Sequence, residues 1–123
     1  MGARVLIIDD DPAVLKLFQL VLSDEGYEVH LLGEIDHAER VIQSVRPELI
    51  IVDHVFGQGQ GLTLLRELRA NPETANLPVI VCSAAAEQLR AYGACIDRLH
   101  ARVVPKPFDL DDLLATVAES LSG

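Results

Sequence analysis

Five polar side chains that could do chemistry follow directly on apolar segments of the 123-residue sequence: Asp9, Asp10, Asp53, Ser83 and Lys106. Each has an ordinary structural explanation when it is taken alone. An Asp often caps a helix, a Ser often forms a turn, and a Lys is commonly just solvated. Their joint occurrence after four separate apolar segments indicates a functional site instead.

Three carboxylates, one hydroxyl and one ammonium group would form a highly charged pocket. Two carboxylates about 5 Å apart repel each other by roughly 3 kcal/mol at an effective dielectric constant near 20. One lysine cannot balance three such groups, whereas a small divalent cation can, and all-oxygen ligands favour Mg²⁺. A carboxylate beside a metal, a lysine and a hydroxyl is suited to phosphoryl transfer to an aspartate, because this chemistry needs positioned cations.

Five short segments rich in Val and Ile are predicted to be strands. They are Arg4–Ile8, Glu28–Leu32, Leu49–Val52, Val79–Cys82 and Arg102–Val104. Apolar residues occupy both faces of these segments, which is typical of a parallel sheet covered by helices on each side.

Segments with helical periodicity lie between and after the strands. Their apolar positions are Val14, Phe18, Val21 and Leu22; Ile35, Ala38, Val41, Ile42 and Val45; Leu62, Leu65 and Leu68; Leu89, Tyr92, Ile96 and Leu99; and Leu110, Leu113, Leu114, Val117 and Leu121. Gly26 and Pro47 are predicted to end the first and second helices, and Asp11 and Asp109 to cap the first and last. The pattern predicts one doubly wound α/β domain over residues 1–123, with (βα)₅ organisation. In such sheets ligands bind at the carboxyl ends of the strands, where all five polar residues stand.

Composition excludes several other classes of protein. The net charge of −9 argues against direct binding to nucleic acid or anionic lipid. No apolar stretch approaches the length of a membrane span or forms a signal sequence, so we expect a cytoplasmic protein with no membrane partner. Cys82 and Cys95 lack the close spacing of a metal pair, and we predict buried, reduced thiols.

Taken together, these residues resemble the receiver domain of two-component response regulators, with the fold of the bacterial chemotaxis regulator. The resemblance rests on the acidic pair Asp9 and Asp10, on Asp53, on Gly61 eight residues later, on Ser83 with Ala84, and on the sequence Lys106, Pro107 and Phe108. It covers essentially the whole chain. It implies a flavodoxin-like, five-stranded parallel sheet with the strand order 2-1-3-4-5.

The resemblance also implies a role for each site residue. Asp53 would accept a phosphoryl group, and Lys106 and Ser83 would bind the phosphoryl oxygens. Asp10 and Asp53 would bind Mg²⁺ directly, and Asp9 largely through a water molecule. The backbone carbonyl of Val55 would be a further metal ligand.

The implied partners are a sensor histidine kinase or phosphotransfer protein as donor, and a downstream protein or output domain. A phosphorylation-dependent dimer is conceivable. The chain would catalyse its own phosphorylation and dephosphorylation without being an enzyme in the usual sense. Several positions depart from the family pattern. At one of them, Val103 stands where a Tyr or Phe often reports phosphorylation, and the sequence does not indicate how the switch works without it. Because the sequence ends just after the last helix, the domain could stand alone or come from a longer protein.

Two alternatives remain open. Asp9 and Asp11 also form the Asp-x-Asp arrangement of haloacid dehalogenase-type phosphatases, followed in order by Ser83, Lys106 and the pair at 111–112. That pair is predicted to lie in the first turn of a helix rather than at a strand end, and Asp53 would have no role. The second alternative is a degenerate receiver that only binds proteins, although the retained charged residues argue against it.

Overall fold

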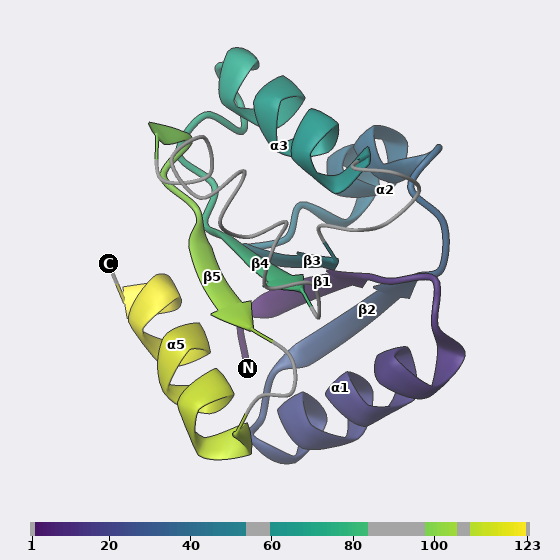
Figure 1. The fold of residues 1–123 in the computed structure, drawn as a ribbon, viewed down its shortest axis with the longest axis vertical. Coiled ribbons are helices and arrows are strands. Elements are labelled where there is room, and N and C mark those ends of the chain that lie inside the picture. Colours follow the sequence, from purple (N-terminus) through teal and green to yellow (C-terminus); the bar gives the residue numbers. More distant parts are fainter. Residues whose placement is uncertain (1, 54–59, 84–97, 106–108, 123) are drawn as a thin grey trace.

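The computed structural model describes residues 2–53, 60–83, 98–105 and 109–122, which form a parallel sheet with helices on both sides (Figure 1). The strands are β1 (Arg4–Ile8), β2 (Glu28–Leu32), β3 (Leu49–Asp53), β4 (Val79–Ser83) and β5 (Arg102–Pro105). The helices are α1 (Pro12–Asp24), α2 (Ala38–Val45), α3 (Gln60–Ala70) and α5 (Leu110–Ser122). The strands agree with the predicted segments to within one residue.

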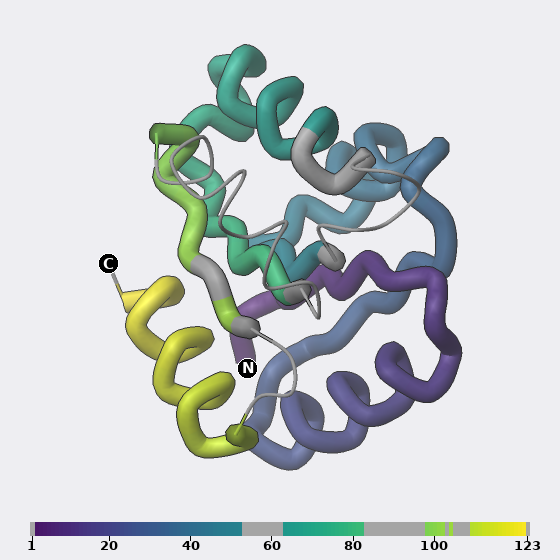
Figure 2. The backbone as a smooth tube through the Cα atoms, in the orientation of Figure 1, coloured from purple at the N-terminus to yellow at the C-terminus, as the bar shows by residue number. Residues whose placement is uncertain are grey.

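The strands follow the order β2-β1-β3-β4-β5, and every neighbouring pair is parallel. In Figure 2 the chain can be traced from β2, at one lateral edge of the sheet, to β3, which lies on the other side of β1. The predicted α/β architecture is therefore confirmed. Four helices are described rather than the five of (βα)₅, because the predicted fourth helix, Leu89–Leu99, falls mostly within residues 84–97, outside the described residues, and Leu99 itself lies in a turn. That helix stays a prediction.

Successive strand residues enter two separate hydrophobic cores. On β1, Leu6 and Ile8 pack into the core formed with α2 and α3, whereas Val5 and Ile7 pack into the core formed with α1 and α5. The same alternation continues along β3 and β4, as expected for side chains that point to opposite faces of a sheet. Cys82 is buried, in agreement with the prediction, while Cys95 lies outside the described residues.

The ends of α1 follow from its sequence. Asp11 is the N-cap, Pro12 is the first helical residue, and the Asp11 carboxylate accepts a hydrogen bond from the Ala13 backbone N–H. At the other end Gly26 has a φ of 91°, a left-handed conformation that costs glycine little. The backbone N–H groups of Gly26 and Tyr27 donate to the carbonyls of Ser23 and Leu22, which is a Schellman motif.

The start of α2 differs from the prediction. Ile35 was predicted to belong to this helix, but α2 begins at Ala38, after a turn in which the Ala38 N–H donates to the Ile35 carbonyl. Ile35 nevertheless packs against the α2–α3 core. This turn residue faces inward, and it therefore extends the helical spacing of apolar residues beyond the start of the helix. Arg46, in a left-handed conformation before Pro47, ends the helix. None of the described helices is long and apolar enough to span a membrane.

Candidate functional site

The backbone register brings the ends of β1 and β3 together. Ile8 pairs with Val52, so the residues that follow, Asp9 and Asp53, stand level at the carboxyl edge of the sheet. Neighbouring strands lie about 4.8 Å apart, which places these two positions next to each other. The chain leaves β1 toward one face and β3 toward the other, and such a switch point is where open α/β sheets bind ligands.

The register also brings β4 and β5 to this edge. Asp53 pairs with Cys82, so Ser83 is one residue further along, and Ser83 pairs with Pro105. Lys106 is the next residue in the sequence. The structure thus brings the backbone positions of Asp9, Asp53 and Ser83 together, while Lys106 and Val55 lie outside the described residues.

Asp9 is buried at the end of β1, with 3% of its surface exposed. Its backbone N–H donates to the Leu32 carbonyl at 3.1 Å, which continues the pairing with β2. Its Oδ1 accepts a hydrogen bond from the Asp11 backbone N–H at 2.9 Å. The Asp9 side chain is therefore bonded to the backbone two residues later in the sequence, and this hydrogen bond orients its carboxylate.

The two neighbouring aspartates differ from Asp9 and from each other. Asp10 is exposed, whereas the Oδ1 of Asp11 accepts from the Ala13 N–H at 2.9 Å and caps α1. Three consecutive carboxylates thus have three environments: one buried and oriented, one open to solvent, and one bound to a helix terminus. The prediction that Asp11 caps the first helix is confirmed.

The chemistry of these donors fits a hard cation. Carboxylate oxygens are preferred ligands of Mg²⁺, and buried carboxylates are generally paired with cations or metals. Asp9 and Asp10 supply carboxylates from adjacent positions in the sequence, while the third predicted carboxylate belongs to Asp53, of which the structure describes the backbone. Among the described residues alone, no group of three or more His, Cys, Asp or Glu side chains could hold a metal ion.

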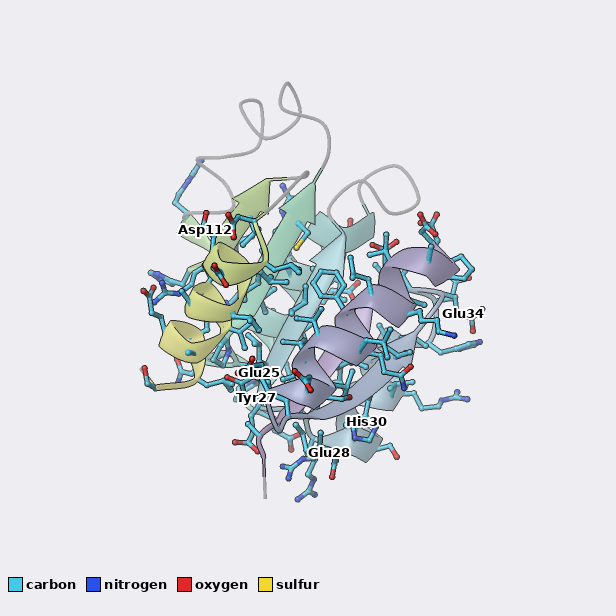
Figure 3. The ribbon with its side chains drawn as sticks, turned by 90° about the horizontal axis from the view of Figure 1, so that it is seen from below. Glu25, Tyr27, Glu28, His30, Glu34 and Asp112 are labelled. Carbon is cyan, nitrogen blue, oxygen red and sulfur yellow. The ribbon has the colours of Figure 1, made fainter. Side chains whose placement is uncertain are left out.

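The residues of the phosphatase alternative occupy less suitable positions. Asp11, the second residue of its Asp-x-Asp arrangement, is the α1 cap described above. Asp111 and Asp112 are exposed in the first turn of α5, where Asp112 is labelled in Figure 3, and the Asp109 carboxylate caps this helix by accepting from the Asp111 N–H at 2.8 Å. The acidic pair therefore follows a helix cap, as the sequence indicated.

Two hollows among the described residues lie between α2 and α3 rather than among the strand-end aspartates. One has a volume of about 750 Å³, with Ile42, Leu68 and Leu77 in its lining. In its wall the carboxyl groups of Glu39 and Glu67 hydrogen-bond to each other, and this bond, with burial and charge repulsion, raises the pKa of Glu67. None of the predicted site residues lines this hollow, whereas the strand register brings three of their backbone positions together.

Comparison with known proteins identifies the family. The family model of the response regulator receiver domain matches residues 5–118. The chain is 32% identical over 121 residues to the phosphate regulon transcriptional regulatory protein PhoB of Rhizobium meliloti, covering 98% of this chain and 53% of that protein. It is 34% identical over 115 residues to the response regulator MprA of Mycobacterium ulcerans, covering 94% of this chain and 48% of that protein. The chain thus spans about half the length of these relatives.

Solved structures agree with this assignment. A protein from Chloroflexus aurantiacus J-10-fl, assigned as a response regulator, superposes with a TM-score of 0.89 at 29% identity over 100% of both chains. The receiver domain of a signal transduction histidine kinase from Syntrophus aciditrophicus gives a TM-score of 0.88 at 25% identity, covering 99% of this chain and 92% of that one. These comparisons support the flavodoxin-like receiver fold and do not favour the phosphatase or the degenerate receiver. The chain belongs to the response regulator receiver domain family and is a receiver domain of two-component signal transduction.

Proposed function

We propose that this receiver domain accepts a phosphoryl group on the carboxylate of Asp53. The observation that carries the proposal is the register at the carboxyl edge, where Asp53 stands level with the buried Asp9 and one residue below Ser83. An Asp53 oxygen would attack the phosphorus of a phosphohistidine. The P–N bond breaks, a P–O bond forms, and the imidazole nitrogen takes up a proton.

Asp9, Asp10, Asp53 and the Val55 carbonyl would hold Mg²⁺, which supplies positive charge to the phosphoryl oxygens. Asp9 is suited to this role because a backbone N–H already orients its carboxylate. Exposed Asp10 gives the cation an open approach from solvent. Lys106 would pair with a phosphoryl oxygen, and Ser83 would donate a hydrogen bond to another.

The wider context is proposed on the same basis. The donor would be a sensor histidine kinase or phosphotransfer protein, and the phosphorylated domain would act on a downstream protein or output domain, with or without dimerisation. We also propose a cytoplasmic location, a single domain over residues 1–123, and a fourth helix that completes the (βα)₅ pattern. Two of the relatives, RpaA of Synechocystis and PhoB of Rhizobium meliloti, are transcriptional regulators by name, and this chain covers 47% and 53% of their lengths.

Intact-mass analysis after incubation with acetyl phosphate and Mg²⁺ tests the central claim. We expect the parent protein to gain the mass of one phosphoryl group, and Asp53→Asn to gain none. Chelation of Mg²⁺ before the donor is added should also prevent the gain. An unmodified parent would favour the degenerate receiver, and a modified Asn variant would move the site to another residue.

A separate titration tests the metal ligands. Asp10→Asn should weaken Mg²⁺ binding at least about tenfold, because even the loss of a residue that only supports a metal ligand typically costs that much. Glu34→Gln, an exposed acidic residue outside the predicted ligand set, is the matched control and should bind Mg²⁺ like the parent. Equal affinities for Asp10→Asn and the parent would remove Asp10 from the ligand set.

A further inference from the structure

One arginine outside the proposed site donates to four backbone carbonyls. Arg69 lies in the last turn of α3, and its Nε donates to the Leu99 carbonyl at 2.6 Å. Its Nη1 donates to the Leu77 carbonyl at 2.7 Å and the Thr74 carbonyl at 3.2 Å, and Nη2 reaches the His100 carbonyl at 3.5 Å. A single guanidinium therefore links α3 to two other segments.

These segments lead into two neighbouring strands. Thr74 and Leu77 belong to the connection between α3 and β4, which begins at Val79. Leu99 and His100 form the turn immediately before β5, and His100 has a φ of 57°, a left-handed conformation that residues other than glycine adopt at a cost. Arg69 thus holds the entry to β4 and the strained entry to β5 together.

The geometry requires arginine in particular. The guanidinium is a planar fork that donates in fixed directions, whereas a lysine ammonium is a compact point charge. Arg69 is half-buried, and desolvation lowers its pKa, yet among the described residues no carboxylate forms an ion pair with it. Its positive charge is therefore stabilised mainly by carbonyl dipoles.

The position of β5 matters because of the residue that follows it. β5 has four residues, is the last strand of the described sheet, pairs there with β4, and ends at Pro105 opposite Ser83. Lys106 comes next in the sequence. A slip by one residue would move this position about 3.3 Å along the strand and reverse its face. The place of Lys106 relative to Asp53 therefore depends on how firmly β5 is held where it begins.

We propose that Arg69 is a positioning residue for Lys106: by fixing the turn before β5 to α3 and to the entry of β4, it sets the position of the strand that ends one residue before the lysine. The proposal rests on the proposed function, in which Lys106 binds the phosphoryl oxygens. It assigns a part in phosphorylation to a residue near the amino ends of the strands, whereas the site lies at their carboxyl ends.

The chain offers a selective probe, because Lys16 and Lys106 are its only lysines. Protein labelled with ¹³C-lysine should give two sets of side-chain NMR signals, with Lys16, exposed on α1, as the internal reference. In Arg69→Met we expect the Lys106 signals to shift or broaden while those of Lys16 stay in place. Arg40→Met, which removes an exposed arginine of α2, is the matched control and should change neither.

Phosphorylation by acetyl phosphate provides the second readout. Arg69→Met should slow it about tenfold, since displacement of a positioning group by about 1 Å can cost up to 10²-fold, while Mg²⁺ affinity stays as in the parent. Arg69→Lys keeps the charge without the fork and should restore the rate only partly, and it also serves if the Met variant does not fold.

Three results would overturn the proposal: Lys106 signals unchanged in both Arg69 variants, a parent-like rate in both, or equal losses of rate and Mg²⁺ affinity. The lysine signals are recorded without a phosphodonor. If the parent protein is not phosphorylated at all, the proposed function fails, and the signals still decide whether Arg69 positions Lys106.

Discussion

The two edges of the sheet use charge in opposite ways. At the carboxyl edge, aspartates gather at the ends of β1 and β3, and three of them are consecutive in the sequence. At the amino edge, arginines bind backbone carbonyls: Arg69 in the manner described above, and Arg4 through Nε to the carbonyls of Val45 and Arg46 at 3.1 and 3.0 Å. Figure 3 separates the two edges, with Asp112 at the start of α5 and Glu25 and Glu28 at the opposite edge.

The direction of the helices explains this division. In a parallel α/β sheet each helix runs back against the strands, so helices begin near the carboxyl edge and end near the amino edge. Helix N-termini carry partial positive charge, and α1 and α5 are capped there by Asp11 and Asp109. Helix C-termini carry partial negative charge, and Arg4 donates to the last carbonyls of α2. The carboxyl edge, which suits anions, therefore carries the proposed phosphorylation site. At the amino edge, arginines hold loops and a helix end in place.

The largest effect on stability is expected at the amino edge. Arg69→Met should lower the free energy of unfolding by about 2 kcal/mol, because it removes hydrogen bonds from a charged donor and leaves half-buried carbonyls unsatisfied. Urea denaturation measures this change, with Arg40→Met as control. A loss below about 0.5 kcal/mol would mean that water replaces the guanidinium without cost and that the two edges differ less than the contacts indicate.

A smaller loss is expected at the carboxyl edge from the carboxylate that caps a helix. Asp11→Ala should lower the free energy of unfolding by about 1 kcal/mol, the usual contribution of an N-cap, because the Ala13 N–H loses its acceptor. Asp109→Ala makes the same change at α5. Similar losses in both variants would show that these aspartates are structural. No loss for Asp11→Ala would reopen a functional role for it.

The adjacent aspartate should behave in the opposite way. Asp10→Asn should raise the free energy of unfolding by a few tenths of a kcal/mol at low salt in EDTA, because it relieves repulsion at an exposed position. With Mg²⁺ present the parent should become the more stable protein, since a cation that binds only the folded state stabilises it. Thermal unfolding with and without Mg²⁺ measures both terms. A loss of stability in EDTA would show that Asp10 is not a repelled carboxylate.

The smallest effect concerns the carboxyl pair between α2 and α3, Glu39 and Glu67. The pKa of Glu67 is raised above its ordinary value of 4.5, first by the hydrogen bond with Glu39. The folded state therefore holds this proton more tightly than the unfolded state, and the stability gained is lost as the pH rises through the raised pKa. Glu67→Gln should remove this decline, which urea denaturation across that pH range would detect. If the difference in unfolding free energy between the parent and Glu67→Gln depended on Mg²⁺, this carboxyl pair would bind the cation, and it would not differ from the carboxyl edge in that respect.

The sequence was most informative where one residue determines one local structure. Strand positions followed from apolar runs that only a doubly covered sheet can bury, and Asp11, Gly26 and Asp109 marked helix ends through caps that act within a few residues. Ile35 misled the prediction, because an apolar turn residue that packs inward continues the helical spacing. Periodicity alone could not distinguish the two cases.

The candidate site was predicted through the fold, because the carboxyl ends of parallel strands must meet at one edge. The register confirms this convergence for the backbone at Asp9, Asp53 and Ser83. Arg69 was missed because its partners are carbonyls of residues 5 to 31 positions away, and any residue type can supply a carbonyl. The only local signal was a basic residue in the last turn of α3, which is common in helices of all kinds.

The hydrogen bonds around Asp11 connect the proposed metal site to the first helix. The Asp11 N–H holds the carboxylate of Asp9, and the Asp11 carboxylate holds the first turn of α1. Metal binding and the ordering of that turn should therefore be thermodynamically linked, and such linkage is reciprocal. Magnesium should protect the first turn of α1 from opening. A partner that binds α1 from outside should in turn change the affinity for magnesium without touching a metal ligand.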